Sequence, residues 1–294
     1  MSIQRSCEEL GYQRSTYYEI KTNKKRAAER EAAVESFVLA EVKKIRVEMP
    51  KLGGKKLYFK INQLEQRKLY KFGERKFFAI LRKHNLLVRR RRKRVKTTDS
   101  SLWHGQYDDL RKELVPTRPE QLWVADITYF RVTNGFVYGH LITDAYSKKI
   151  VGYTVSADMK ATSTLRALKM ALNNRMYTDK LIHHSDRGLQ YLSKVYTKYL
   201  KKREISISVT QDGSPYDNAV AERINGILKS EFGLDETLSN LQQVQHVMKK
   251  ATQIYNDQRP HWSNQLLTPN QMHAQQSRKI ITYHRPIKTL SKIA

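Results

Sequence analysis

The stretches LWVADITYFRV (residues 122–132) and FVYGHLITDAYS (136–147) decide the fold class of this chain. Both are rich in β-branched and aromatic residues, which is typical of strands. Asn134-Gly135 between them is a strong signal for a tight hairpin turn. We therefore predict an antiparallel strand pair that carries a carboxylate, Asp126, in the middle of its first strand.

Outward from this hairpin the pattern alternates between strands and helices. Further strands are predicted at 149–158, 181–185 and 205–209. Helices are predicted at 161–176, 192–203, 218–232, 238–258 and 268–277. Three strands in series, followed by alternating helix and strand, indicate an α/β fold with a mixed five-stranded sheet flanked by helices.

Residues 1–88 are predicted to form an all-α region. Apolar residues recur there at three- and four-residue spacing, which predicts helices at 24–48, 54–64 and 74–85. Two short helical pieces around Gly11, within 7–21, have the rhythm of a helix-turn-helix, in which the second helix would read a DNA groove. Plain helical packing is the alternative, and the charge of the region favours DNA binding.

Charge is the most unusual property of the composition. The 294 residues include 55 Lys and Arg against 28 Asp and Glu, a net charge of +27, and residues 1–100 alone hold +17 of it. This excess predicts a polyanionic partner, with nucleic acid ahead of an anionic membrane surface. The sequence has no apolar run long enough to span a bilayer and no signal-peptide stretch, so we expect an intracellular protein without a membrane partner. Cys7 is the single cysteine, which excludes an internal disulfide and a cysteine-rich zinc site.

A dense basic run separates the helical region from the α/β region. Such a run is commonly a solvated segment, but its place between two folded regions favours a linker that also binds DNA phosphates. Its residues are Arg89, Arg90, Arg91, Arg92, Lys93 and Arg94. The predicted organisation is a helix-turn-helix-like DNA-binding region (1–88), a basic linker (89–118), an α/β core with C-terminal helices (119–278) and a tail (279–294).

Three carboxylates are candidates for chemistry. Asp126 lies in a strand that we expect to be buried, where a carboxylate is costly unless it is paired or binds a metal. Asp186 ends the short strand 181–185, and ligands of open α/β sheets bind where strands end. Glu222 lies in the first turns of helix 218–232. Any one of these acids alone is more commonly structural, and we interpret Asp144, another strand acid, as structural.

The helix that carries Glu222 has a polar side. Asn218, Glu222, Asn225 and Lys229 align along it, opposite an apolar side that would face the core. Three carboxylates with a basic rim match metal-assisted phosphoryl transfer, in which two Mg²⁺ ions about 4 Å apart bind the attacking and leaving oxygens. Hard cations prefer oxygen ligands, which explains why the candidates are carboxylates.

The spacing and the flanking motifs resemble one family. Fifty-nine residues separate Asp126 from Asp186, and thirty-five separate Asp186 from Glu222, with Lys229 seven residues later. The chain is similar to second-reading-frame transposases of the insertion-sequence-three family, which carry an integrase catalytic core. The resemblance is strongest over 120–275 and looser over 30–90, and its motifs are WVADITYF (123–130), HHSDRGLQY (183–191), SPYDNAVAERINGILKSE (214–231) and YNDQRPHWSNQLLTPNQM (255–272).

The resemblance implies an RNase H-like core and a transposase that cleaves and transfers DNA strands of an insertion sequence at a metal-dependent Asp-Asp-Glu site. It places the acidic triad, as catalytic residues and metal ligands, on Asp126, Asp186 and Glu222, and the DNA-contacting lysine on Lys229. The expected cofactor is a pair of Mg²⁺ ions, for which Mn²⁺ can substitute. The expected partners are the element's ends, target DNA, the product of an upstream first reading frame and further copies of the chain on DNA, in a bacterial cytoplasm.

Several further side chains are assigned by their setting. We expect Asn218, Asn225 and Arg187 to contact DNA, with a neighbouring acid as the equal alternative for Arg187. His183 and His184 are expected to pack or to contact phosphate. Core positions are predicted for Trp123, Tyr129, Phe130 and Tyr153, and Arg259 and His261 are left open between DNA contacts and helix packing.

Two other functions compete with a transposase. One is a DNA-binding regulator derived from a transposase with little or no catalysis, against which the presence of all three carboxylates argues. The other is a retroviral-type integrase, whose zinc-binding domain of His and Cys a chain with one cysteine cannot build.

Overall fold

The computed structural model describes residues 9–88, 107–112, 114–211 and 218–275, together with Ile3 and Cys7. The chain divides into two compact units, residues 1–93 and 94–294, which are described separately below. The predicted basic residues Arg89 to Arg94 and the predicted tail 279–294 lie outside the described residues.

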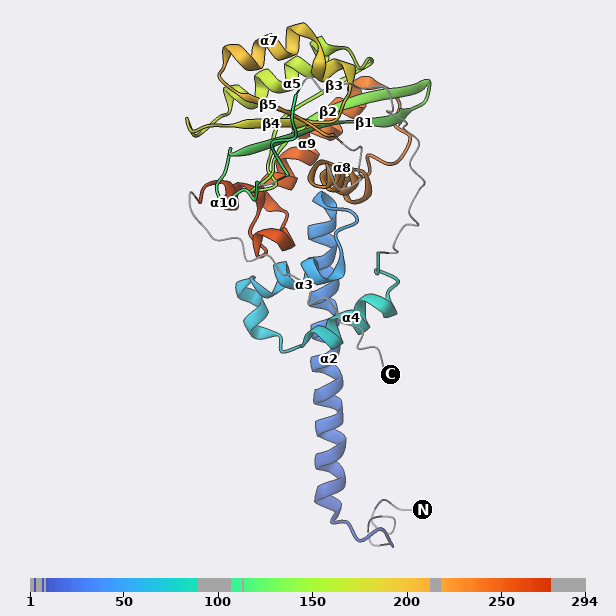
Figure 1. Ribbon diagram of the computed structural model, residues 1–294. Helices are drawn as coiled ribbons and strands as arrows, with labels where there is room; N and C mark the ends of the chain where they lie inside the picture. Colours follow the sequence, from blue (N-terminus) through green and yellow to red (C-terminus); the bar gives the residue numbers. More distant parts are fainter. Residues whose placement is uncertain are drawn as a thin grey trace, which may run out of the picture. The chain divides into compact units, whose positions relative to one another are not determined.

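The N-terminal unit is helical, as predicted (Figure 1). It consists of α2 (Arg14–Glu48), α3 (Gly54–Asn62), the short 3-10 helix η1 (Glu65–Leu69) and α4 (Glu74–Lys83). The second half of α2 buries one stripe of side chains that includes Val34, Val38 and Val42. Stacked aromatic rings of Phe72 and Phe77 help to close this small core.

The prediction of two short helical pieces around Gly11 is wrong about the length of the second piece. Residues 14–21 are the start of α2, which continues without a break for 35 residues. No Gly or Pro interrupts the sequence between Arg14 and Glu48, so nothing ends the helix early. Gly11 does mark a boundary, because its φ of 71° lies in the left-handed region. Whether this unit reads a DNA groove stays a prediction.

The second unit contains one five-stranded mixed sheet, as predicted (Figure 1). Its strands are β1 (Leu122–Val132), β2 (Gly135–Asp144), β3 (Ile150–Ser156), β4 (Ile182–Ser185) and β5 (Ser206–Val209), and the spatial order is β3-β2-β1-β4-β5. β1, β2 and β3 pair antiparallel, whereas β4 pairs parallel with both β1 and β5. This arrangement is the RNase H-like sheet that the sequence resemblance implied.

Helices cover both faces of the sheet (Figure 1). On one face lie α5 (Ala161–Asn173), α6 (Leu189–Leu192) and α7 (Lys194–Lys202), which pack with Trp123 and Ala125 of β1. On the other face, α8 (Ala219–Phe232) packs against β1 and β2, and α9 (Leu241–Gln258) packs against β3. Leu122 and Val124 belong to the α8 side, because successive residues of a strand point to opposite faces.

The C-terminal helices are tied to the sheet by polar contacts. Asn256 of α9 accepts from the Ile150 backbone N–H at 3.0 Å and donates to the Ile150 carbonyl at 2.9 Å, which extends the edge of β3. After the 3-10 helix η2 (Trp262–Asn264), Thr268 caps α10 (Pro269–His273) with a capping box and Pro at its first turn, within the helix predicted at 268–277.

Arg259 and His261 are packing residues, which resolves the alternative that the sequence left open. Arg259 is buried and forms two 2.7 Å hydrogen bonds with the carboxylate of Glu231. His261 is also buried, and its ring nitrogen Nδ1 bonds the Ser263 hydroxyl at 2.9 Å. Both side chains therefore fasten the segment between α9 and α10.

One of the four predicted core aromatic residues is misplaced. Trp123 and Phe130 are buried, and Tyr153 is half-buried, but Tyr129 is 55% exposed. The ring of Phe130 lies over Gly139, where any Cβ would collide with it. Tyr129 points to the other face, beyond the helices that cover Trp123 and Ala125. Strand alternation fixes the face of each residue, but the sequence did not show where helical cover ends.

Candidate active site

Two of the predicted acids come together because β1 and β4 run parallel. Val124 of β1 lies beside His184 of β4 in the register. Asp126 and Asp186 each follow two residues later, so both reach the same edge of the sheet, at the carboxyl end of β4. The Asp186 side chain is exposed there and accepts a hydrogen bond from the Gly188 N–H at 3.0 Å.

Helix α8 brings the third acid to the same edge. Asn218, which caps the helix, donates to the carbonyl of Ala125 at 3.0 Å. Two turns later, Asn225 donates to Oδ2 of Asp126 at 2.7 Å. Glu222 lies between these asparagines on the helix and is exposed. The two amides thus hold the Glu222 turn of α8 against Ala125 and Asp126.

We expected Asn218 and Asn225 to contact DNA, and the structure uses both inside the protein. Both side chains are buried, and their amide groups donate to β1. The polar stripe predicted on α8 is divided: its two asparagines lie against β1 beside Asp126, whereas Glu222 between them is exposed. A DNA contact of either asparagine stays an untested prediction.

The electrostatics show that the three carboxylates are close enough to interact. The pKa of Asp126 is raised to about 7, mainly by burial, then by the negative charge of Asp186 and, more weakly, by that of Glu222. Hydrogen bonds from the Ile127 N–H and the Asn225 amide oppose this shift without cancelling it. Asp126 is therefore an acid whose ionised form needs an additional positive charge.

The fit of these residues to a divalent metal is partial. Their oxygen donors and the mutual repulsion of their charges suit a hard cation such as Mg²⁺. Within the described ranges, however, no group of three or more His, Cys, Asp and Glu side chains is arranged to hold a metal as it stands. Of the two acids that act on Asp126, Asp186 acts more strongly, so the Asp126–Asp186 pair fits better than the full triad.

The neighbouring residues that the sequence singled out have defined places. Lys229 of α8 lies with its ammonium 4.4 Å from the centre of the Tyr129 ring. Arg187 donates to the carbonyl of Thr210 at 3.1 Å. His183 and His184 are buried in packing roles, one of the two alternatives predicted, bonded at 2.9 Å to the hydroxyls of Tyr196 and Ser208. Burial lowers the pKa of His183 to about 3, so its ring is neutral.

Asp144 belongs to a different, structural cluster, as the sequence predicted. Its carboxylate is fully buried and accepts 2.7 Å hydrogen bonds from the Glu120 N–H and from the N–H and hydroxyl of Ser147. His273 of α10 bonds the Ser147 hydroxyl at 2.9 Å and lies 3.4 Å from the Glu120 carboxylate. The sequence carried no signal for Glu120 or His273, because they are 153 residues apart.

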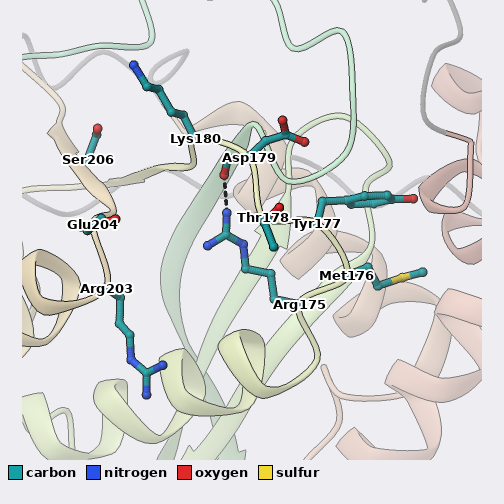
Figure 2. Close-up of a pocket in the computed structure, with 9 residues that line it drawn as sticks. All are labelled: Arg175, Met176, Tyr177, Thr178, Asp179, Lys180, Arg203, Glu204 and Ser206. Atoms are coloured by element: carbon teal, nitrogen blue, oxygen red, sulfur yellow. Dashed lines mark hydrogen bonds between the residues drawn. The ribbon is translucent and has the colours of Figure 1, made fainter.

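A pocket of about 580 Å³ lies elsewhere in this unit (Figure 2). Its lining comes from the segment Arg175 to Lys180 and from Arg203, Glu204 and Ser206, near the starts of β4 and β5. Figure 2 shows the guanidinium of Arg175 bonded to Asp179, whose acceptor is the backbone carbonyl. Asp186 follows the opposite end of β4, so this pocket is separate from the acids.

The five-stranded sheet, with acids at the end of β4 and on α8, defines the class of integrases and transposases with an RNase H-like core. Two models described as integrase core domain match the chain, at residues 116–215 and 203–269. The transposase for insertion sequence element IS629 of Shigella sonnei is 32% identical over 255 residues, which cover 86% of this chain and 85% of that relative. The chain belongs to the insertion-sequence-three family of transposases.

Other relatives match a shorter part. The putative transposase for IS986/IS6110 of Mycobacterium tuberculosis is 40% identical over 130 residues, 42% of this chain and 47% of that protein. Transposase InsF for insertion sequence IS3A of Escherichia coli is 36% identical over 122 residues, 42% of each chain. Among solved structures, the HTLV-2 integrase catalytic core domain in complex with magnesium is 20% identical, with a TM-score of 0.44 over 53% of this chain and 97% of that chain.

In the parts of the chain that the structure describes, no helix combines the length and the apolar character needed to cross a bilayer.

Proposed function

We propose that this transposase cleaves the ends of its insertion sequence and transfers the freed strands to target DNA through Asp126, Asp186 and Glu222. The observation that carries the proposal is the convergence of the three acids. The β1–β4 register brings Asp126 and Asp186 to one edge, and the charges of Asp186 and Glu222 act on Asp126. The mutual repulsion of carboxylates brought together costs stability, and a bound cation would relieve it.

The chain's own residues have separate tasks in this proposal. Asp126 and Asp186 would hold a divalent cation, and Glu222 would complete the ligand set from α8. Two Mg²⁺ ions would activate the attacking oxygen and stabilise the leaving oxygen, and Mn²⁺ can take their place. Asn225 donates to Oδ2 of Asp126 and so fixes the orientation of the carboxylate that would bind the cation. The dependence on a cation follows from the raised pKa of Asp126, since a bound ion would keep this carboxylate ionised at neutral pH.

Basic residues would hold the DNA around the acids. Lys229 lies two turns beyond Glu222 on α8, and Arg187 follows Asp186 directly. Arg89 to Arg94 would bind further phosphates, which agrees with the net charge of +27. We also propose that the product of an upstream reading frame and further copies of this chain assemble on the element's ends.

The test is Glu222→Gln in the full chain, with Mg²⁺ and DNA duplexes that carry the element's terminal inverted repeats. We expect loss of cleavage and joining with unchanged binding of the duplex, because the exchange removes one charge and keeps the side chain's size. Glu204→Gln is the matched control, since Glu204 lines the pocket near the start of β5. Joining by Glu222→Gln at the wild-type rate would contradict the triad. A wild-type chain that binds the repeats but never cleaves them would favour the regulator.

A further inference from the structure

The exposed ring of Tyr129 belongs to a cluster that the acids do not explain. Phe136 of β2 lies opposite Arg131 of β1 in the hairpin, and its ring meets that of Tyr129 edge to face, with centroids 5.5 Å apart and planes at 89°. Tyr129 is 55% exposed and Phe136 is 49% exposed. Two large rings therefore form an open right-angled corner on the protein surface. We call Tyr129, Phe136, Arg131 and Lys229 the hairpin corner.

The corner stays open because the sheet is narrow at this point. β4 pairs with β1 only from Leu122 to Val124, so in the described residues the far half of the β1–β2 hairpin runs past β4. On the sheet face that carries Tyr129, helices α5, α6 and α7 cover only the first half of β1, where Trp123 and Ala125 are buried. The segment around Leu238 bonds the backbone of Arg131 and Thr133 and leaves the two rings exposed.

Cations flank both rings. The ammonium of Lys229 lies 4.4 Å from the Tyr129 centroid, and the guanidinium of Arg131 lies 5.9 Å from the Phe136 centroid. The nearby segment contributes Asp235, whose carboxylate oxygens are buried, and Glu236 as an exposed acid. The two cations beside the exposed rings suit an anionic ligand that also has a flat apolar face.

A nucleotide has both properties. Aromatic side chains beside a basic groove are the usual platform for unpaired bases, because every base can stack whatever its sequence. A base inside a duplex is stacked on its neighbours and cannot reach such a ring. Tyr129 follows Asp126 by three residues, about 10 Å along β1, and their side chains leave opposite faces of the strand. Lys229, on the same helix as Glu222, reaches the Tyr129 ring and so links the corner to the acids.

We propose that the hairpin corner binds an unpaired nucleotide of the DNA strand next to the acids, with the base stacked on Tyr129 or Phe136 and the phosphates near Arg131 and Lys229. This inference rests on the proposed function in that DNA is the ligand. It adds that the strand must be locally unpaired, which an acidic triad does not require.

The test measures binding of the full chain to a single-stranded oligonucleotide of about 20 nucleotides and to the matching duplex, each with a central 2-aminopurine that reports stacking by fluorescence quenching. For Tyr129→Ala we expect about 5- to 100-fold weaker binding of the single strand with loss of quenching, and little change for the duplex. Tyr129→Phe keeps the ring and is expected to bind within about twofold of wild type. Arg131→Ala is expected to reduce the log–log salt slope for the single strand by about 0.7.

Trp262→Ala is the matched control, because Trp262 belongs to the same unit and is also 55% exposed. Thermal melting of each variant shows whether it is folded. The proposal is overturned if Tyr129→Ala binds the single strand like wild type, if Trp262→Ala loses as much affinity, or if duplex and single strand lose affinity equally. It is also overturned if light scattering shows that Tyr129→Ala changes the oligomeric state of the chain and that this change accounts for the lost affinity.

These results are separable from failure of the proposed function. If the wild-type chain joins DNA ends and Tyr129→Ala binds the single strand as wild type does, only the proposal for the hairpin corner is overturned. A wild-type chain that quenches 2-aminopurine through Tyr129, but never cleaves or joins DNA, overturns the catalytic proposal alone.

Discussion

Asp126 and Asp144 are two aspartates on paired strands of one sheet, and their surroundings differ completely. Asp144 is fully buried and accepts three 2.7 Å hydrogen bonds. Asp126 is half-buried, and two neighbouring carboxylates repel it. The first carboxylate is stabilised by hydrogen bonds from the protein, whereas burial and neighbouring negative charges disfavour the ionised form of the second. The partners of a strand acid, and not its burial alone, therefore separate structure from function.

The largest expected effect is the loss of activity in Asp126→Asn. The exchange keeps the size of the side chain and its acceptor for Asn225, but it removes the charge that would hold a metal. We expect strand cleavage to fall by more than about 100-fold. Melting temperature without metal should stay the same or rise, because the repulsion by Asp186 and Glu222 is relieved. A large fall in melting temperature would contradict the comparison with Asp144.

Asp144→Asn should lower the stability of the protein and leave its cleavage activity intact. It leaves the hydrogen-bond donors around Asp144 without a full set of acceptors, and we expect the free energy of unfolding to fall by about 2–4 kcal/mol. Denaturant titration measures this change. At a temperature where the variant is folded, its cleavage rate should stay close to that of wild type, because Asp144 bonds Glu120 and Ser147 rather than the three acids. A variant that is stable but inactive would place Asp144 in the active site.

Asn225→Ala should have a smaller effect that is specific to the site. Partners of metal ligands commonly contribute 10- to 100-fold to metal affinity or activity, and we expect a loss of about that size in the Mg²⁺ dependence of cleavage. Asn218→Ala is the control, because the amide of Asn218 donates to the Ala125 carbonyl and, among the described residues, to no carboxylate. Both variants should melt earlier, but only Asn225→Ala should need more Mg²⁺. Equal Mg²⁺ requirements would reduce Asn225 to a packing role.

The smallest effects are two pH dependences of stability without metal. Asp126 titrates at about 7 in the folded chain and near 3.8 when unfolded. Between these values only the folded state holds the proton, so its contribution to stability should fall as pH rises from about 4 to 7 and then level off. Asp126→Asn should remove this fall, which urea titrations at a series of pH values would measure.

The Asp144 cluster should respond in a different range. Burial lowers the pKa of His273, but its contacts with Asp144 and Glu120 outweigh burial and raise the pKa above 6.5. The stability that His273 contributes is thus complete below pH 6.5 and is lost as pH rises through the raised pKa. His273→Gln should remove the fall above pH 6.5 and leave the fall below 7 that belongs to Asp126. A single shared pH profile would show that the two clusters are not independent.

Much of the fold could be predicted because strand and helix patterns are local. The five strands and the helices of the second unit lie close to their expected ranges, and the family resemblance supplied the arrangement of the sheet. The prediction failed where local patterns end. The short helical pieces predicted around Gly11 overlooked the absence of Gly and Pro from residues 14–48, which form one helix of 35 residues. Tyr129 was expected in the core because it lies in an apolar strand. It is exposed because the helices that cover this face of β1 end before it, which is a tertiary property.

The sequence by itself determined the candidate acids, the basic character and the family of this transposase, because these depend on residue types and their spacing. Only the tertiary structure decided what each polar side chain does. It turned the amides of Asn218 and Asn225 toward β1, joined Glu120 to His273 across 153 residues and left the hairpin corner open. The physical reason is that burial, charge coupling and hydrogen bonding depend on neighbours in space, which the folded sheet brings together from distant parts of the chain.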